Sequence, residues 1–274
     1  MDKKYFILSE DFEGIIRAHL ANVSYVEKIP TGWTNFVFVA TTTGGEKYIC
    51  RFPRNDFFAD CLVKEVPITG FMRGHVLVNT VEQRLAKHEG RNFSIHKMVS
   101  GQVMQDTYPS LNFKQKKKLA GEIADYILSV QNINPPNGLV AQLASEFLYN
   151  LSKVNNGDYD YSKLDRLREL EKNPVLVHGD LNPRNIILDQ DGRLVAVLDY
   201  AFVTFSCDIN DLARVIGQSP KDFYEIMVDA FEARTGKKVN RSDLDYLIDL
   251  WNYVSQDYVS YMLREHPDVV LPPE

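Results

Sequence analysis

A short polar stretch between apolar segments combines the residue types that phosphoryl transfer from a nucleotide requires. Asp180 and Asn185 follow the apolar run 174–177, and Asp199 follows a second apolar run at 194–198. A carboxylate can accept the proton of an attacking hydroxyl, and an asparagine and a second carboxylate are the hard oxygen ligands that Mg²⁺ prefers. We therefore predict Asp180 as the catalytic base and Asn185 and Asp199 as magnesium ligands.

A β-hairpin is predicted to bring these side chains together. Apolar strands at 186–188 and 194–198 are separated by the turn Asp189-Gln190-Asp191-Gly192. In an ordinary hairpin such polar residues would only shape turns. Because apolar strands flank the polar residues on both sides, the spacing favours a loop and hairpin that aim them at one point.

The sequence His-Gly-Asp ending at Asp180, with Asn185 five positions later, resembles the catalytic loop of the aminoglycoside phosphotransferase and choline kinase-like small-molecule kinases. This resemblance implies an α+β, two-lobed protein-kinase-like fold. Its N-terminal lobe would be an antiparallel sheet with one or two helices, and its C-terminal lobe mostly helical. It also implies ATP or GTP as phosphoryl donor and Mg²⁺ as cofactor.

The predicted elements follow the same order. We expect a nucleotide-binding lobe over residues 1–96, a hinge over 97–101, and a catalytic and substrate lobe over 102–274. In the first two parts, apolar periodicity predicts helices over 9–21 and 60–72 and strands over 23–29, 35–41, 47–52 and 92–101. In the last part it predicts helices over 112–130, 141–154, 161–170, 208–216, 220–234 and 242–264.

Composition narrows the class of protein. A chain of 274 residues with 45% hydrophobic content can bury a substantial core. Its net charge of −6 argues against nucleic acid as a partner, since phosphate backbones are bound by clustered Lys and Arg. Three cysteines show no disulfide or metal-ligand spacing, and no long apolar run suggests a membrane segment. We expect a cytoplasmic monomer or weak dimer that binds a nucleoside triphosphate and a small-molecule acceptor.

Arg51 stands on the third predicted strand, where the resemblance places the lysine that contacts the nucleotide phosphates. Glu65 lies beside the helix stripe that faces the sheet, and a carboxylate there is costly unless it is paired. Arg51 can supply a bidentate partner, whereas Lys47 and Lys64 fit the register less well. An Arg51 side chain that faces solvent is the alternative.

Further nucleotide contacts are implied by the resemblance alone. His96 would lie at the back of the base pocket and bias the choice of purine, or else be a packed strand residue. Gly32, Thr34 and Asn35 would lie in the loop that covers the phosphates, unless this segment is an ordinary hairpin connection. Lys97, Met98 and Val99 would form the hinge backbone that contacts the base.

Two residues near the catalytic loop are predicted to support it. His178 adjoins the proposed base, and its ordinary pKa near neutrality would suit a base, but the resemblance makes it a packed scaffold residue. Asp211 either caps a helix or hydrogen-bonds the backbone of the catalytic loop.

The acceptor is predicted to be a hydroxyl of a small amino-bearing molecule of the aminoglycoside or amino-sugar type, consistent with an antibiotic-resistance role. An acidic stripe on the last helix would hold its amines, unless that stripe is only a solvated face. An aromatic cage would instead suit choline, ethanolamine or another metabolite. The candidate acceptor residues are Tyr200, Asp245, Asp249, Trp251 and Tyr253.

Two other functional classes stay open. A regulatory module that binds nucleotide without transferring phosphate would usually lack one of the three polar residues, and all are present. Protein kinase activity is disfavoured by the His-Gly-Asp sequence and by Asp199-Tyr200-Ala201. The sequence leaves open the identity of the acceptor and the choice between ATP and GTP.

Overall fold

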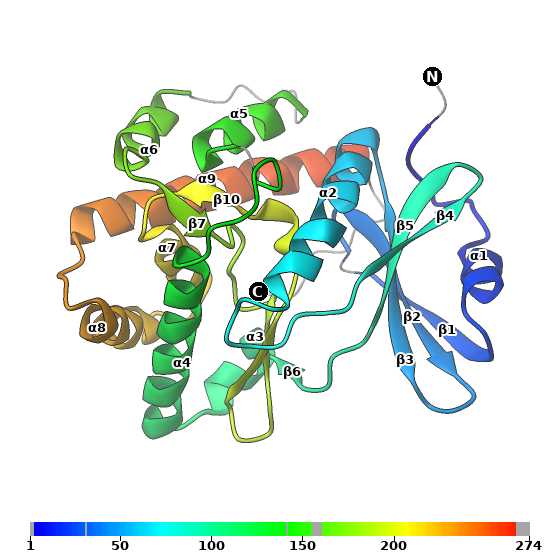
Figure 1. The fold of residues 1–274 in the computed structure, drawn as a ribbon, viewed down its shortest axis with the longest axis horizontal. Coiled ribbons are helices and arrows are strands. Elements are labelled where there is room, and N and C mark those ends of the chain that lie inside the picture. The colour runs from blue at the N-terminus through cyan, green and yellow to red at the C-terminus, as the bar shows by residue number, and fades with distance from the viewer. Residues whose placement is uncertain (1–2, 31, 141, 155–160, 267–274) are drawn as a thin grey trace. The chain divides into compact units, whose positions relative to one another are not determined.

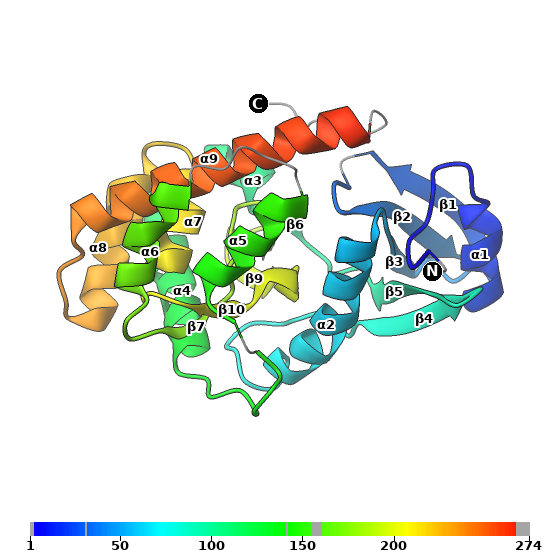
Figure 2. The ribbon, with the colours of Figure 1, turned by 90° about the horizontal axis from the view of Figure 1, so that it is seen from above.

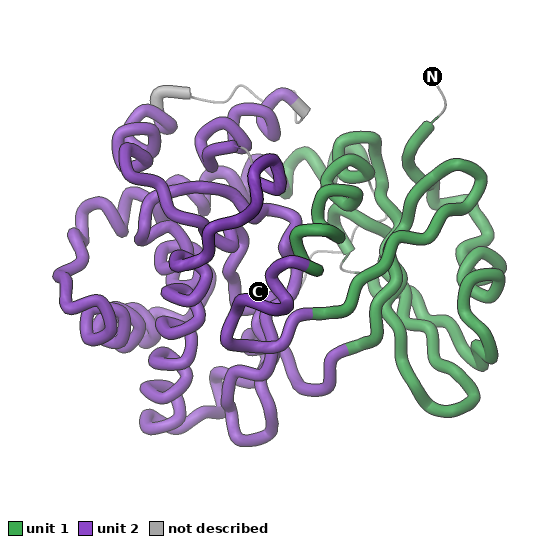
Figure 3. Tube along the Cα trace, in the orientation of Figure 1, with its two compact units in different colours: residues 1–70, 81–98, 259–274 green, residues 71–80, 99–258 purple. Residues whose placement is uncertain are grey.

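The computed structural model describes residues 3–30, 32–140, 142–154 and 161–266. The chain forms two compact units (Figure 3). Unit 1 comprises Met1–Gly70, Val81–Met98 and Val259–Glu274, and unit 2 comprises Phe71–Thr80 and Val99–Tyr258. The division into lobes at residues 96 and 102 stays a prediction.

Unit 1 is built on an antiparallel sheet with strand order β1-β2-β3-β5-β4 (Figure 1). Side chains alternate across β3, so Cys50 and Phe52 are buried on one face while Arg51 points to the other. Helix α1 packs on the Cys50 face, and α2 lies on the opposite side of the sheet (Figures 1 and 2). The elements are α1 (Phe12–His19), β1 (Val23–Ile29), β2 (Asn35–Thr42), β3 (Lys47–Pro53), α2 (Asp56–Met72), β4 (Arg84–His88) and β5 (Arg91–Lys97).

The core of unit 1 is a cluster of aromatic rings between α1 and the sheet. Phe52 stacks on Phe93 with ring centroids 4.6 Å apart, and its centroid lies 5.0 Å from those of Phe6 and Phe12. All four side chains are buried. This cluster fixes β3 and therefore the strand that carries Arg51.

Strand β4 was not predicted from the sequence. It pairs with β5 through a tight turn in which Glu89 and Gly90 both have positive φ, at 47° and 83°. Two consecutive left-handed residues form the turn type that matches strand twist, and Asn-Gly or Asp-Gly usually mark it. Glu-Gly is a weaker signal, which explains why the hairpin was missed.

Unit 2 is mostly helical, as predicted. Two small sheets hold the polar loop, one with order β6-β8-β9 and one pairing β10 with β7. The helices are α3 (Met104–Thr107), α4 (Phe113–Gln131), α5 (Ala144–Val154), α6 (Asp165–Leu170), α7 (Asn210–Gly217), α8 (Phe223–Thr235) and α9 (Arg241–Glu265), the last extending into unit 1. The strands are β6 (Gln102–Val103), β7 (Val175–Val177), β8 (Ile186–Leu188), β9 (Leu194–Val197) and β10 (Thr204–Ser206).

Most predicted helices agree with the structure within a few residues, and several differ in their starts. The helix predicted from Asp208 begins at Asn210, so Asp208 precedes the helix. The helix predicted from residue 141 is described from Ala144, and residue 141 lies outside the described residues. The predicted α+β class, with a sheet followed by helices, is confirmed. Among the described residues, no helix combines the length and apolar character that crossing a membrane needs.

Candidate active site

The β8–β9 hairpin sets two of the predicted site residues side by side in register. Ile186 pairs with Val197, and just beyond this pair the Leu198 amide donates to the Asn185 carbonyl oxygen at 2.8 Å. Asn185 and Asp199 therefore lie at the same end of the hairpin. Asp199 has a positive φ of 62°, a conformation that few non-glycine residues adopt and that is often found at functional sites.

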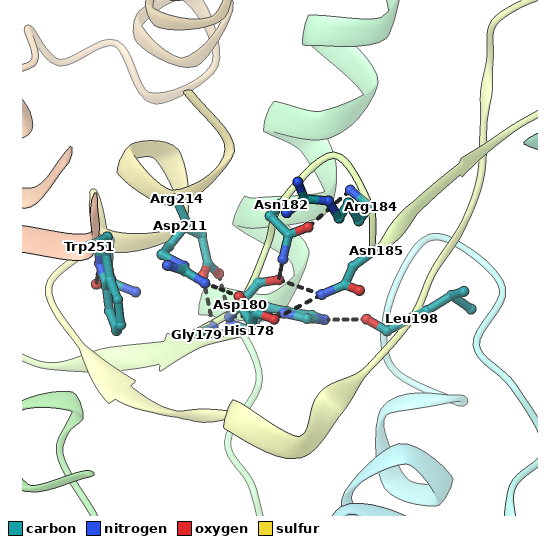
Figure 4. A network of polar contacts seen from close by, with 11 residues as sticks. His178, Gly179, Asp180, Asn182, Arg184, Asn185, Leu198, Asp211, Arg214 and Trp251 are labelled. Atoms are coloured by element: carbon teal, nitrogen blue, oxygen red, sulfur yellow. Dashed lines mark hydrogen bonds and ion pairs between the residues drawn. The ribbon is translucent and has the colours of Figure 1, made fainter. Parts of the chain in front are cut away.

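Asp180 contacts Asn185 directly (Figure 4). The Asn185 side-chain nitrogen Nδ2 donates to the Asp180 carboxylate oxygen Oδ2 at 3.0 Å and to the Asp180 carbonyl oxygen at 2.9 Å. The Asp180 side chain keeps 17% of its surface exposed. Its carboxylate is thus held in a defined orientation and still reached by solvent.

Asp211 anchors the backbone of this loop from α7 (Figure 4). Its two carboxylate oxygens accept the backbone amides of His178 at 2.7 Å and of Gly179 at 2.9 Å. Burial raises the pKa of Asp211 to about 6, while these hydrogen bonds act in the opposite direction. The predicted hydrogen bond to the loop backbone is confirmed, and no side chain caps α7 at its N-cap residue, Ile209.

Gly179 is the only residue type that fits its position without strain. Its φ is +77°, and an added Cβ would overlap the carbonyl oxygen of Phe202. Only glycine adopts this conformation readily and allows such a close approach. The glycine thus lets the loop turn sharply just before Asp180.

His178 is fully buried beneath the loop. Its ring atom Nε2 lies 3.0 Å from the Leu198 carbonyl oxygen, and the Asp180 amide donates to Nδ1 at 3.3 Å. These contacts assign a neutral ring with its proton on Nε2. Burial lowers the pKa of His178 to about 4. The ring joins the loop of Asp180 to the residue before Asp199, as expected of a scaffold residue.

Arg214 is a site residue that the sequence analysis missed. Its guanidinium, on α7, forms an ion pair with the Asp180 carboxylate oxygen Oδ1 and lies 4.4 Å from the centre of the Trp251 ring (Figure 4). Burial lowers the pKa of Arg214 to about 9, which leaves it charged at neutral pH. A sequence signal existed, because Arg214 lies one helical turn after Asp211 on a helix whose other residues are mostly apolar.

The donor atoms near Asp180 suit Mg²⁺. Since Nδ2 of Asn185 is held by Asp180, its carbonyl oxygen Oδ1 is the atom suited to be a ligand, and Asp199 adds a carboxylate. Within the described ranges, no group of three or more His, Cys, Asp or Glu side chains could hold a metal ion. Mg²⁺ is usually bound by one or two carboxylates together with substrate phosphates.

In unit 1, the predicted pairing of Arg51 with Glu65 is confirmed. Arg51 Nη1 lies 2.6 Å from Glu65 Oε1, and the two side chains are 12% and 2% exposed. The alternative partners Lys47 and Lys64 are exposed. The strand alternation that buries Phe52 on one face directs Arg51 to the face covered by α2.

The loop predicted to cover phosphates is tied down from within unit 1. Arg54 donates from Nε and Nη2 to the Gly32 carbonyl oxygen at 3.2 and 3.1 Å, a contact the sequence did not suggest. Asn35 is only 4% exposed, and its Nδ2 donates to the Thr34 hydroxyl at 2.7 Å. The Asn35 side chain therefore braces the loop, which differs from its predicted contact with nucleotide.

The predicted hinge residues also differ in part from expectation. The Met98 amide donates to the Lys47 carbonyl oxygen at 2.8 Å, so this N–H is not available to a purine as predicted. The His96 side chain is 9% exposed, and its Nδ1 lies 3.1 Å from the Lys97 carbonyl oxygen. Lys97 directs its ammonium group to Glu46, and Val99 begins the second segment of unit 2.

Two of the five predicted acceptor residues are core residues. Tyr200 is fully buried and accepts a hydrogen bond from the Tyr126 hydroxyl at 3.1 Å, and Trp251 is 7% exposed beneath Arg214. These placements correct their assignment as acceptor contacts and leave the predicted aromatic cage incomplete. Asp245 and Asp249 are exposed on α9.

Asp245 and Tyr253 already have neighbours within unit 2. Asp245 accepts from the Tyr224 hydroxyl at 2.7 Å, and the Lys163 ammonium lies 4.9 Å from the centre of the Tyr253 ring. Asp245 and Asp249 still form an exposed acidic face on α9.

The model of the phosphotransferase enzyme family matches residues 26–245, more than half of the chain. A search of curated protein sequences finds no match.

Solved structures of phosphotransferases have a similar fold. The GDP complex of an aminoglycoside 2′-phosphotransferase of type IIIa has 18% identity and a TM-score of 0.69, covering 94% of this chain and 93% of that chain. The streptomycin and ATP complex of APH(2″)-IIa has 16% identity and a TM-score of 0.65, with coverages of 97% and 100%. A macrolide 2′-phosphotransferase from Brachybacterium faecium has 14% identity and a TM-score of 0.66, with coverages of 95% and 98%. The likeness shows that the fold is that of these enzymes.

Proposed function

Because the chain belongs to the phosphotransferase enzyme family, we propose that it transfers the γ-phosphate of ATP or GTP to a hydroxyl of a small amino-bearing molecule. The observation that carries this proposal is the contact between Asp180 and Asn185 at the end of the β8–β9 hairpin. A carboxylate held beside an amide, with Asp199 on the adjoining strand, is the donor set that phosphoryl transfer uses.

Asp180 is the proposed base. It orients the acceptor hydroxyl and accepts its proton as the hydroxyl oxygen bonds to phosphorus and the nucleoside diphosphate leaves. Asp211 and His178 hold the loop and do not touch the reacting groups, because Asp211 binds backbone amides and the His178 ring is buried.

Asn185 and Asp199 are the proposed ligands of Mg²⁺. When bound there, Mg²⁺ would neutralise negative charge on the β- and γ-phosphates. The hydrogen bonds from Asn185 Nδ2 to Asp180 support this role, because they orient the amide group as a ligand would require.

Arg51 is the proposed phosphate contact in unit 1, oriented by Glu65. The 2.6 Å ion pair supports this role, since a buried carboxylate fixes the orientation of the guanidinium. Similar structures hold ATP in one case and GDP in another, so both donors belong in the test.

The proposed acceptor is an aminoglycoside or a related amino sugar, consistent with a role in antibiotic resistance. One similar structure holds streptomycin and another is a macrolide phosphotransferase, and the exposed carboxylates Asp245 and Asp249 would suit a cationic acceptor. Choline is less well supported, because Tyr200 and Trp251 are buried. We further propose that the protein acts in the cytoplasm as a monomer or weak dimer. We also propose that its two lobes are divided by a hinge between residues 96 and 102.

The test is release of nucleoside diphosphate over a panel of aminoglycosides, amino sugars, macrolides, choline and amino alcohols, with ATP and GTP measured side by side. Turnover with an amino-bearing acceptor, abolished by chelation of Mg²⁺, is the expected result. Asp180→Ala should lower kcat by at least about 1,000-fold and leave nucleotide binding intact. Arg51→Met should instead weaken nucleotide binding.

Asp191→Ala is the matched control, since Asp191 is an exposed aspartate in the turn of the same hairpin. Its turnover should equal that of wild type. Normal turnover by Asp180→Ala would contradict the assignment of the base. Magnesium-dependent nucleotide binding without transfer to any acceptor would favour a regulatory module.

A further inference from the structure

The carboxylate of Asp180 lies between two donors from different elements (Figure 4). Arg214, on α7, donates to Oδ1, and Asn185 Nδ2 donates to Oδ2 at 3.0 Å. We propose that Arg214 is a positioning residue that fixes the reacting carboxylate of Asp180, and that Trp251 holds Arg214 in place. This inference rests on the proposed function.

Trp251 is itself fixed by the helix that carries Arg214. Its ring lies 4.4 Å from the guanidinium carbon, and its Nε1 donates to the Asn210 carbonyl oxygen Oδ1 at 3.1 Å. Asn210 and Arg214 are one turn apart on α7. The contacts therefore run without interruption from Asn210 through Trp251 and Arg214 to Asp180, and the Arg214 side chain has little freedom to move.

Stability alone gives little reason for an arginine at this position. The Arg214 side chain is 8% exposed, and its Nε has no hydrogen-bond partner within the described part of the chain. A desolvated cation and an unsatisfied N–H both cost free energy, and apolar replacements of buried ion pairs are often neutral or stabilising. A costly buried charge that touches the reacting carboxylate is therefore better explained by the reaction than by folding.

The ion pair leaves Asp180 able to act. Each carboxylate oxygen has two lone pairs, so Oδ1 and Oδ2 can accept an acceptor hydroxyl in addition to the donors already present. Without Arg214, Asn185 would be the one side chain left to donate to this carboxylate among the residues that the structure describes. A displacement of about 1 Å from the reactive geometry can cost about 100-fold in rate.

Steady-state kinetics of the variants test the inference, with the best acceptor and donor of the wild-type enzyme. Arg214→Met should lower kcat by about 100-fold while the nucleotide KM stays within about threefold of wild type. Arg214→Lys should recover part of kcat, since it restores a charged donor without the planar guanidinium. Trp251→Phe, which keeps an aromatic face but loses the Nε1–H bond to Asn210, should show a smaller loss in kcat.

Arg166→Met is the matched control. Arg166 pairs with Asp243 at 2.6 Å and lies 5.0 Å from the Tyr246 ring. It therefore also combines a guanidinium with a carboxylate and an aromatic ring, but away from Asp180. Its kcat should equal that of wild type. Circular dichroism and the thermal unfolding midpoint show which variants fold. If Arg214→Met does not fold, the kcat values of Arg214→Lys and Trp251→Phe test the positioning role.

Two failures can be told apart. If wild type transfers phosphate and the folded Arg214 and Trp251 variants keep wild-type kcat, the positioning role is wrong and the proposed function stands. A nucleotide KM that rises as much as kcat falls, with no recovery in Arg214→Lys, would likewise overturn it. If wild type transfers phosphate to no acceptor, the proposed function fails and this inference fails with it.

Discussion

Burial acts on two titratable residues beneath the catalytic loop in opposite directions. It disfavours the charged form, so it lowers the pKa of His178 to about 4 and raises that of Asp211 to about 6. The two groups therefore contribute opposite dependences of stability on pH. Comparing wild type with a variant at His178 isolates the contribution of His178, because Asp211 contributes equally to both proteins.

His178 should make folding less favourable in acid. Its ordinary pKa is 6.5 and its folded pKa about 4, so the unfolded chain binds the proton more tightly. The stabilising contribution is fully present above pH 6.5 and is lost as the pH falls toward 4. Between about pH 8 and pH 5, wild type should lose about 2 kcal/mol more unfolding free energy than His178→Gln.

Urea unfolding at several pH values measures this difference. The control is His75→Gln, which replaces an exposed histidine and should follow the pH profile of wild type. If His178→Gln and wild type had parallel profiles, His178 would not be buried in its neutral form.

At the scale of elements, the loop between β7 and β8 depends on one backbone conformation. Gly179 turns the chain at φ +77° against the Phe202 carbonyl, and Asp211 on α7 accepts the two amides that the turn exposes. The loop is thus held by contacts from two other segments, at Phe202 and at Asp211. Displacing it would move Asp180 relative to Asn185.

Gly179→Ala should therefore impair both catalysis and stability. The Cβ cannot fit beside Phe202, so we expect turnover to fall by about 100-fold and unfolding free energy by about 1–3 kcal/mol. Steady-state kinetics and urea unfolding of the same preparations measure both.

Gly236→Ala provides the comparison at a similar backbone angle. Gly236 ends α8 at φ +68° with no neighbouring atom within 4 Å of an added Cβ. It should lose about 1 kcal/mol of stability and keep full turnover. Equal turnover in both variants would mean that the loop tolerates a displaced Gly179.

At the scale of the whole molecule, the two units contain different parts of the proposed machinery. Unit 1 holds Arg51 and Glu65 above an aromatic core, and unit 2 holds Asp180, Asn185 and Asp199. The stability of the Arg51 strand is therefore expected to depend on the core of unit 1.

Phe52→Ala should loosen unit 1 selectively. Removing a fully buried ring that contacts four other aromatic rings should cost about 3–5 kcal/mol. Hydrogen exchange should speed up in β2, β3 and β5 and stay unchanged in β7 and β8, with nucleotide binding weakened. Phe113→Ala, at a phenylalanine that is 61% exposed, is the control. Faster exchange throughout both units would show that they open together.

The sequence by itself determined those features that depend on local spacing. The Asp180 to Asn185 interval and the hairpin that follows it bring their side chains together, because a short loop and strand register leave few other arrangements. Strand alternation around Arg51 and the helical stripe beside Glu65 predicted their ion pair. The resemblance of one motif to a kinase family, together with apolar periodicity along the chain, predicted the α+β class and the order of elements.

Only the tertiary structure decided contacts between residues far apart in sequence. Arg214 contacts Asp180, which is 34 positions away in sequence, and Arg54 contacts Gly32, which is 22 positions away. The direction of both arginine side chains depends on how the elements pack. The same packing buries Tyr200 and Trp251, which the sequence suggested as aromatic contacts for an acceptor. Periodicity tells which side of a helix is apolar, but the neighbour covering that side is chosen by the free energy of the whole packed core.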